Sequence, residues 1–480
     1  MRRIFLLVAV AVALVACGDK VDYPTAIGKL KTKSLAEVQN NLVVGCETLD
    51  RDYADYHAYK EYLVPRGMRY IRLQAGWAKT EQKVGVYDFA WLDSIIDDAV
   101  SRGLEPWLEL SYGNPIYPGG GTKFLMGGWP TSKVAIEAWC NWVRASAERY
   151  KGKVHQWEIW NEPDITIRRN NYNPQEMVDL AILTSRIIKS IDPTAKIAVY
   201  GIASGREVAT ADALIGLLAM ELRASGEEHL VDWVSYHGYQ YEPEQSYFID
   251  GDSLRKILRR NNLNIDIWQG ESGAPSVGYK GGALGEYNWS EQTQAKWDIR
   301  RMMNDHGNGV RTSVFSISDM NYSANDEVKM KNYKGLLSTD ENSRVIRPKM
   351  AYYAVQNFVA VFDNLDSSLD AQNLKIITPA ADSVGKQLVY MFEDKESGLQ
   401  SIALWRGGAT PVDGEWSDVV SVEAPAFNCK RPICVDILHG TIYDLPYRRI
   451  GRRFIFDAVP YYDSPIIICD ESLIDTEEIK

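Results

Sequence analysis

The sequence predicts an α/β fold, a (β/α)8 TIM barrel followed by an antiparallel β-sandwich. Between residues 41 and 363, short apolar runs alternate with segments of helical period, which is the pattern of a parallel sheet covered by helices. After residue 364 the apolar runs are separated by turn residues, as in a sandwich. The chain of 480 residues is also longer than one small core requires. We therefore assign residues 41–363 to the barrel and residues 364–480 to the sandwich.

Eight runs in the first region are short, continuous and rich in β-branched or aromatic residues, as buried parallel strands are. These predicted strands are residues 42–46, 69–73, 105–110, 154–160, 196–200, 231–236, 265–269 and 312–317. Between them, Leu92, Ile95 and Ala99 recur at helical spacing. Gly103 follows as a C-cap, and Ser290 opens a further helix. Eight strands with eight crossovers predict a closed barrel.

The region after residue 364 contains short strand-like segments. They are residues 388–392, 400–405, 419–422, 433–438 and 466–469. Gly-Gly and Asp-Gly pairs at 407–408 and 413–414 are typical turn residues. This alternation predicts an antiparallel sandwich of roughly a hundred residues. Residues 18–40 form a polar lead-in, from which we expect an edge strand of the sandwich.

The first 17 residues have the features of a targeting segment. Arg2 and Arg3 precede an apolar run, residues 4–15, that is too short to span a bilayer. Residues 14–17 read Leu-Val-Ala-Cys and resemble the box of bacterial lipoproteins, which implies cleavage before Cys17 and a lipid on its thiol. We therefore expect a protein at the bacterial cell envelope that meets the membrane through this N-terminal lipid anchor only. Whether it faces the periplasm or the cell surface stays open.

Composition and charge narrow the classes of partner. The formal net charge of −11 argues against nucleic acid and against an anionic membrane surface. The 14 Trp and 27 Tyr residues supply flat apolar faces on which sugars stack. Five cysteines remain after Cys17, an odd number that rules out complete intramolecular pairing. Cys429 and Cys434 are either bridged or free. No Cys or His spacing indicates a metal site, so we expect no cofactor, and a structural metal ion stays an open question.

The fourth predicted strand carries the most informative motif. Residues 157–164 read Trp-Glu-Ile-Trp-Asn-Glu-Pro-Asp. Because Pro163 cannot donate to a sheet ladder, the strand ends there and leaves Glu162 on its C-terminal rim. Glu271 takes the same position after the seventh predicted strand. The C-terminal ends of barrel strands meet at one mouth, so we expect Glu162 and Glu271 to face each other across it.

Such a pair of carboxylates suits the cleavage of a glycosidic bond. One acid protonates the leaving oxygen while the other attacks or supports the anomeric carbon. Arg72, at the end of the second predicted strand, is expected to keep Glu271 ionised. Neighbouring tryptophans and the charge of Glu271 are expected to push Glu162 toward its protonated form. Further candidates for substrate binding or support are Asn161, His237, Tyr239, Trp77, Tyr112 and Asp319.

These motifs resemble clan A glycoside hydrolases, in particular family 39 and its near relatives, over residues 41–363. Asn161-Glu162-Pro163 is similar to the acid/base strand of the clan, and Glu271 to its nucleophile position. The resemblance implies a retaining O-glycosyl hydrolase that acts on oligo- or polysaccharides through a covalent glycosyl-enzyme intermediate. The alternative is a non-catalytic glycan-binding lipoprotein on the same scaffold.

The resemblance also implies roles for other residues. Arg72 is similar to the arginine that steadies the nucleophile, and Asn161 to the residue that binds the sugar 2-hydroxyl. His237 and Tyr239 are similar to the aromatic polar group after the sixth strand. The sequence departs from many clan members at Ser318-Asp319, where they carry a tryptophan, so the floor of the central subsite stays open. The sugar, the linkage and exo or endo action are open as well.

Overall fold

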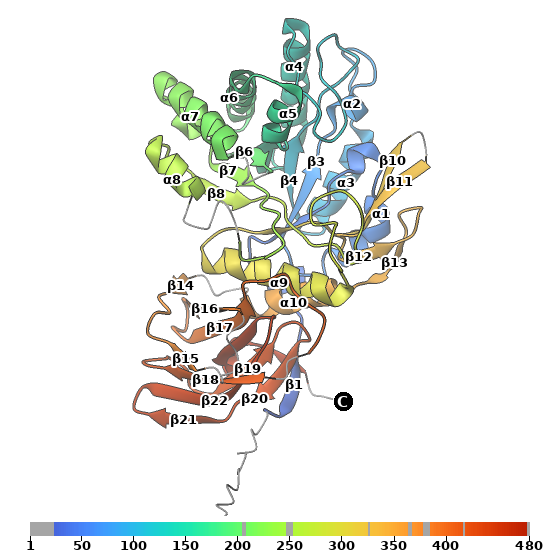
Figure 1. Ribbon diagram of the computed structural model, residues 1–480. Helices are drawn as coiled ribbons and strands as arrows, with labels where there is room; N and C mark the ends of the chain where they lie inside the picture. Colours follow the sequence, from blue (N-terminus) through green and yellow to red (C-terminus); the bar gives the residue numbers. More distant parts are fainter. Residues whose placement is uncertain are drawn as a thin grey trace, which may run out of the picture.

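The computed structural model describes residues 24–203, 208–245, 253–324, 327–362, 367–377, 385–415 and 418–477 (Figure 1). The targeting segment 1–17 with Cys17 lies outside the described residues, as does the start of the lead-in.

An eight-stranded parallel sheet forms the barrel in this described part of the chain. Its strands are β2 (Val43–Gly45), β3 (Tyr70–Gln74), β4 (Glu105–Leu110), β5 (Gln156–Ile159), β6 (Lys196–Ile202), β7 (Trp233–Tyr236), β8 (Asp266–Gln269) and β9 (Ser313–Val314). Strands from β2 to β8 pair in chain order, and β9 pairs with β2. The isolated parallel bridges Trp268–Arg311 and Ser272–Val314 bring the β8 segment to the β9 segment, so the ring is nearly closed. The predicted barrel is confirmed, and each predicted strand segment overlaps one of these strands.

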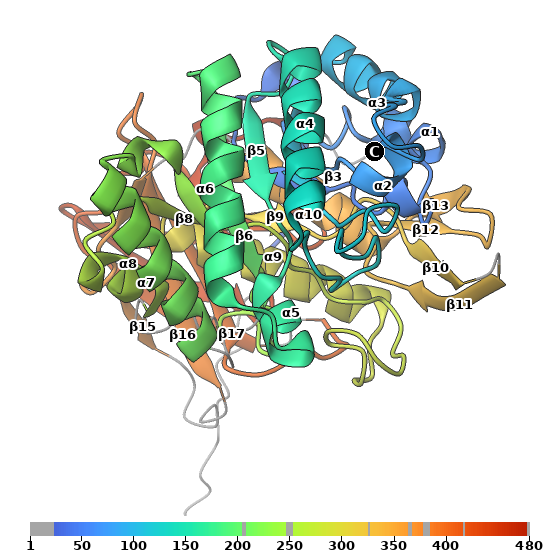
Figure 2. The same cartoon turned by 90° about the horizontal axis from the view of Figure 1, so that it is seen from above.

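Helices pack around the outside of the barrel sheet (Figure 2). They are α1 (Tyr56–Tyr59), α2 (Trp77–Thr80), α3 (Ala90–Ser101), α4 (Lys133–Tyr150), α5 (Pro163–Asn170), α6 (Pro174–Ile191), α7 (Val208–Ser225), α8 (Ser253–Arg260), α9 (Glu291–Gly307) and α10 (Met350–Phe362). Short 3-10 turns are η1 (Leu35–Glu37), η2 (Leu49–Arg51), η3 (Lys60–Tyr62), η5 (Glu228–Leu230) and η7 (Glu471–Leu473). The apolar residues predicted for α3, Leu92, Ile95 and Ala99, are buried. The Ser290 hydroxyl caps α9 by accepting a hydrogen bond from the Thr293 N–H.

Two antiparallel hairpins follow β9 before the last barrel helix. The first consists of β10 (Met320–Ala324) and β11 (Glu327–Asn332), and the second of β12 (Leu337–Thr339) and β13 (Val345–Pro348). None of the helices in the described ranges is long and apolar enough to cross a membrane.

The C-terminal region is antiparallel and consists of two sheets. The first has the order β14 (Ser367–Leu369), β16 (Lys386–Glu393), β17 (Gln400–Gly407), β23 (Ile466–Asp470), β19 (Pro432–Asp436), β20 (Thr441–Asp444), β1 (Ala26–Leu30) and β24 (Thr476–Glu477). The second has the order β15 (Lys375–Ile377), β18 (Asp418–Ala424), β22 (Arg453–Tyr461) and β21 (Tyr447–Ile450). We expected the lead-in to supply an edge strand. Its strand β1 instead lies inside the sheet, because β24 pairs with its other side.

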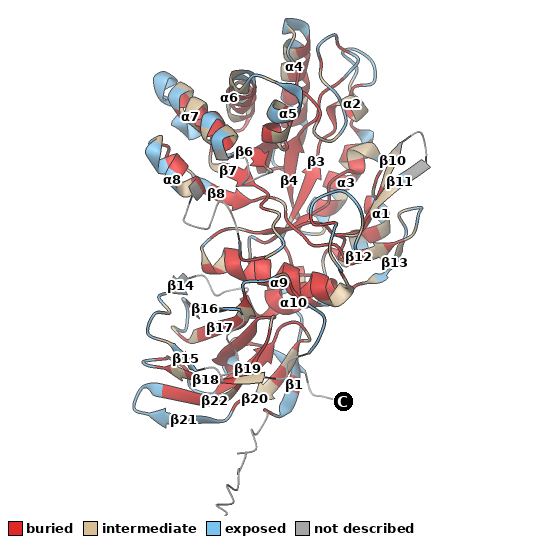
Figure 3. Ribbon diagram, viewed as in Figure 1, coloured by how far each residue is buried: buried red, intermediate tan, exposed pale blue. Residues whose placement is uncertain are grey.

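Helices α9 and α10 lie between the barrel and the sandwich (Figures 1 and 3). Helix α9 is buried along most of its length although it carries several charges. Its Arg300 donates to both carboxylate oxygens of Glu244, at 2.6 and 2.8 Å. Its Lys296 Nζ lies 2.6 Å from an oxygen of Asp463 in the sandwich. Pairing of this kind lets a charged helix lie inside the molecule. The predicted boundary between residues 363 and 364 falls outside the described residues.

The five described cysteines, Cys46, Cys140, Cys429, Cys434 and Cys469, carry free thiols. The question left open for Cys429 and Cys434 is thereby answered. The Cys429 thiol faces the Asp470 carboxylate, with Sγ at 3.6 Å from Oδ2.

Candidate active site

A cavity of about 660 Å³ opens at the C-terminal ends of the barrel strands. Glu162 and Glu271 both line it, as the reading of strand ends predicts. Phe315 and Tyr322 supply aromatic side chains to the same cavity.

The backbone around Glu162 is held in an unusual conformation. Glu162 is the N-cap of α5, Pro163 is its first residue, and Glu162 has φ of +53°. The Glu162 N–H donates to the carbonyls of Tyr200 and Gly201, at 3.0 and 3.1 Å. Trp160 and Tyr200 also have positive φ, at +69° and +85°. Left-handed conformations are unfavourable for non-glycine residues and gather where the surrounding fold holds a functional group in place.

Glu271 follows β8 and is held by two donors. The Tyr239 hydroxyl donates to its Oε1 at 2.7 Å, and Arg72 Nη1 donates to its Oε2 at 3.2 Å. Burial alone would raise the pKa of Glu271, but the nearby charges of His237 and Arg72 and the Tyr239 hydrogen bond bring it below its ordinary value. Glu271 is therefore ionised at neutral pH.

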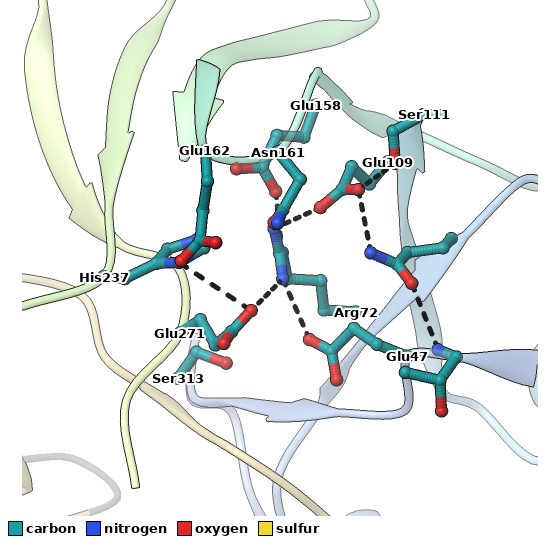
Figure 4. Close-up of polar contacts among 12 residues, drawn as sticks. Glu47, Arg72, Glu109, Ser111, Glu158, Asn161, Glu162, His237, Glu271 and Ser313 are labelled. Carbon is teal, nitrogen blue, oxygen red and sulfur yellow. Dashed lines mark hydrogen bonds and ion pairs between the residues drawn. The ribbon is translucent and has the colours of Figure 1, made fainter. Parts of the chain in front are cut away.

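The two carboxylates face each other across the cavity (Figure 4). One oxygen of each, together with a ring nitrogen of His237, lies within 4.8 Å of the others. His237 Nδ1 is 3.0 Å from Glu162 Oε1 and 3.8 Å from Glu271 Oε2. Burial alone would lower the pKa of His237, yet the charges of Glu271 and Glu162 and a hydrogen bond to Glu162 raise it to about 9.

The same three residues are close enough to hold a metal ion. A histidine must be neutral to bind a metal, whereas the raised pKa of His237 keeps it protonated at neutral pH. A metal ion bound here would therefore have to displace the proton of His237.

Arg72 is the centre of the polar network (Figure 4). It is fully buried and contacts four carboxylates, those of Glu47, Glu109, Glu158 and Glu271. Four acids cannot all be ionised around one guanidinium. Burial raises the pKa of Glu47 to about 8 and that of Glu109 to about 7, so protonation of these two relieves the excess negative charge.

Asn161 and Tyr112 lie next to this network. Asn161 Oδ1 accepts a hydrogen bond from Arg72 Nη2 at 3.0 Å, and its Nδ2 donates to the Tyr112 hydroxyl at 2.8 Å. The amide of Asn161 is thereby fixed at the cavity wall. Tyr112 is buried and acts on the site through Asn161.

Two predicted site residues that the structure describes, Trp77 and Asp319, neither line the cavity nor form a hydrogen bond with Arg72, Glu162 or Glu271. Trp77 is fully buried, donates from Nε1 to Glu81 at 2.7 Å and stacks on Tyr117 and Trp142, so it has no free face for a sugar. Asp319 is buried against Lys349, whose Nζ lies 2.6 Å from its Oδ1. Both expectations were wrong because tertiary packing had already given these side chains partners.

Some residues that line the cavity, among them Glu47 and Lys334, were not predicted from the sequence. Glu47 lies two residues after the end of β2, so applying the strand-end rule to the first strand would have found it. Lys334 follows β11 in an irregular segment and had no such signal. Its Nζ donates to the Tyr279 hydroxyl at 2.9 Å, and burial lowers its pKa to about 7.

Part of this chain is similar in sequence to known glycoside hydrolases. Residues 30–260 match the sequence model of Glycosyl hydrolases family 39. The family 39 match includes Arg72, Glu162 and His237 but ends before Glu271. A β-xylosidase of Geobacillus stearothermophilus is 27% identical over 212 residues, which are 40% of this chain and 40% of that protein. These matches support a glycoside hydrolase.

Solved structures share the fold. A family 39 glycoside hydrolase from Bacteroides cellulosilyticus WH2 has a TM-score of 0.60 at 15% identity, covering 90% of this chain and 81% of that chain. A monomeric β-xylosidase from Caulobacter crescentus CB15 has a TM-score of 0.57 at 16% identity, covering 95% of this chain and 98% of that chain. Both similarities extend over most of this chain, which contains the barrel and the C-terminal sheets.

Proposed function

We propose that this chain is a retaining glycoside hydrolase that cleaves oligo- or polysaccharides by double displacement. The observation that carries the proposal is the approach of the Glu162 and Glu271 carboxylates to within 4.8 Å across one cavity. Retaining enzymes place their carboxyl groups at about 5–5.5 Å, whereas inverting enzymes leave room for a water between them. The short separation favours retention.

In the first step Glu271 attacks the anomeric carbon. Its lowered pKa keeps the attacking oxygen ionised. The bond between the anomeric carbon and the leaving oxygen breaks, and Glu162 gives that oxygen a proton. His237 Nδ1 lies 3.0 Å from Glu162 Oε1, and the raised pKa of His237 keeps its ring protonated at neutral pH, so a proton stands within hydrogen-bond distance of the Glu162 carboxyl.

In the second step water replaces Glu271. Glu162, now a carboxylate, takes a proton from the water, whose oxygen attacks the anomeric carbon. The ester bond to Glu271 breaks and the carboxylate returns to Arg72 and Tyr239. Two inversions at one carbon give a product with the original configuration.

The names of similar proteins indicate which substrate to test first. Two of the curated relatives, from Geobacillus stearothermophilus and Caldicellulosiruptor saccharolyticus, are named β-xylosidases. We therefore propose a β-xyloside as the first substrate to test, within a screen of nitrophenyl glycosides and polysaccharides. A non-catalytic glycan-binding protein would bind oligosaccharide in a calorimeter and release no product.

Glu162→Ala is expected to slow substrates with poor leaving groups by roughly 10²–10⁴-fold, because they need a proton from the enzyme. Activated nitrophenyl glycosides are expected to lose far less in the first step, since their leaving oxygens depart without protonation. Steady-state kinetics on a series of leaving groups measures the difference. Equal losses across the series would remove Glu162 from the role of proton donor. Glu158→Gln, at a buried acid four residues earlier, is the matched control without leaving-group dependence.

We also propose that Cys17 carries a lipid that holds the protein at the cell envelope; the support is the targeting sequence of residues 1–17. Cys17→Ser is expected to move the protein from the membrane fraction to the soluble fraction and to abolish labelling by radioactive palmitate. Cys140→Ser, at a partly buried cysteine on α4, is the control that should keep the label. Label retained in Cys17→Ser would refute the attachment.

A further inference from the structure

The turn between β21 and β22 is an unusual segment for an acidic protein. Residues 446–453 read Pro-Tyr-Arg-Arg-Ile-Gly-Arg-Arg, and all eight are exposed. Four arginines thus fall within six positions of a chain whose net charge is −11. We call residues 446–453 the basic turn.

Two of its arginines are neutralised by neighbours on the sheet. Arg448 donates to both oxygens of Asp457 at 2.9 Å, and Arg453 lies 3.3 Å from Glu423. These two ion pairs connect the ends of the turn to the neighbouring strands. They also cancel the charges of Arg448 and Arg453.

The other two arginines carry the free charge of the turn. Arg449 donates to the Gly451 carbonyl at 3.1 Å and lies 4.9 Å from the ring of Phe454, neither of which is an anion. Arg452 has no ion pair with any residue that the structure describes. The basic turn therefore presents two uncompensated positive charges to solvent.

Apolar side chains stand beside these charges. Ile450 is 63% exposed and Tyr447 is 43% exposed. Exposed tyrosine and isoleucine next to arginine are the combination that enters the headgroup region of a bilayer.

The segment that leads into the basic turn contacts the start of the described chain. The Asp444 N–H donates to the Thr25 carbonyl at 2.9 Å, and Tyr447 follows Asp444 by three residues. Cys17 precedes Thr25 by eight residues, which span at most about 29 Å. Figure 1 places β1 and β21 in the sandwich, with α9 and α10 between them and the barrel.

We infer that the basic turn docks on an anionic phospholipid surface and sets the orientation of the protein on the membrane. The inference rests on the proposed lipid at Cys17, which would hold the turn within reach of the headgroups. Attraction to anionic lipids acts over about 10 Å, so only this turn and its surroundings would feel it. The acidic remainder of the chain is repelled, which turns the barrel away from the bilayer. Docking by the basic turn would add a second membrane contact to the lipid anchor, which the sequence alone led us to expect as the only one.

Arginines on an edge strand also discourage pairing with other sheets, and β21 is the edge of its sheet. That role needs no lipid and predicts no vesicle binding. A binding experiment therefore separates the two explanations.

The experiment uses the chain from Gly18 onward, which lacks the proposed lipid and keeps every described element. Sedimentation with vesicles of phosphatidylglycerol and phosphatidylcholine is compared with vesicles of phosphatidylcholine alone. We expect binding to the mixed vesicles only, decreasing as salt is raised. Arg449→Glu/Arg452→Glu should weaken it by about tenfold or more. Arg144→Glu/Arg223→Glu, the same charge change on exposed residues of α4 and α7, should bind as the parent does.

Equal binding by the basic-turn variant and the parent would overturn the inference, as would equal loss in the control pair or equal binding to phosphatidylcholine alone. Tighter binding to a soluble anionic polysaccharide than to the vesicles would overturn the choice of a membrane. Thermal unfolding checks that both variants are folded. A failure of lipid attachment shows separately, in the palmitate labelling of Cys17.

Discussion

Glu271→Ala is expected to lower kcat on any glycoside substrate by roughly 10⁴- to 10⁶-fold, because the group that forms the covalent bond is gone. The cavity left by the side chain admits a small anion. Added azide should therefore restore turnover of an activated aryl glycoside and give a glycosyl azide of inverted configuration. Product analysis by NMR shows the configuration directly.

Glu47→Ala provides the matched control for this result. Glu47 is a buried acid on the same guanidinium, with its Oε1 at 3.0 Å from Arg72 Nη1, and it lines the same cavity. Its removal is expected to reduce activity without any rescue by azide. Near-normal turnover in Glu271→Ala, or azide rescue in both variants, would show that Glu271 is not the nucleophile.

Arg72→Met is expected to lower the free energy of unfolding by about 3–5 kcal/mol, because it leaves buried carboxylates without their counter-charge. It should also raise the pKa of Glu271, since the guanidinium helps to lower it. The nucleophile must be ionised, so the acid limb of the kcat/KM profile should move to higher pH. Denaturant unfolding and a pH–rate profile measure the two effects.

Arg300→Met is the control that separates the effect of Arg72 on the pH profile from its effect on the free energy of unfolding. Arg300 is equally buried and pairs with Glu244, but on α9 between barrel and sandwich. Its loss should cost a similar unfolding free energy and leave the pH profile unchanged. An unshifted acid limb in Arg72→Met would contradict the role of Arg72 in holding Glu271 ionised. Arg72→Lys keeps a charge without the planar fork, so an intermediate effect is expected.

Local sequence was sufficient for much of the fold and for the position of both acids. Pro163 begins α5 because it lacks an N–H and has a helical φ, and Glu162 lies just before it as the N-cap, three residues after β5 ends at Ile159. Glu271 follows β8 by the same strand-end rule. The N-cap Ser290 and the apolar spacing in α3 predicted helices from residues that lie within one or two turns of each other. Each of these signals depends on a few neighbouring residues.

Other features could not be read from the chain. A tryptophan such as Trp77 has the same local signature whether it meets a sugar or the rings of Tyr117 and Trp142. Asp319 is paired with Lys349, thirty residues later in the chain, and is therefore not available to a substrate. The charged helix α9 is buried because Glu244 and Asp463 form ion pairs with its Arg300 and Lys296. Lys334 lies in an irregular segment with no periodicity to interpret.

By itself, the sequence determined the order of the strands, the segments in which they lie and which acids stand on the rim of the barrel. Only the tertiary structure decided which carboxylates share a guanidinium and which carboxyl holds its proton. The physical reason is range. Capping and periodicity act over a few residues, whereas Arg72 and Glu271 are 199 positions apart and acquire their charges from the groups that burial brings around them.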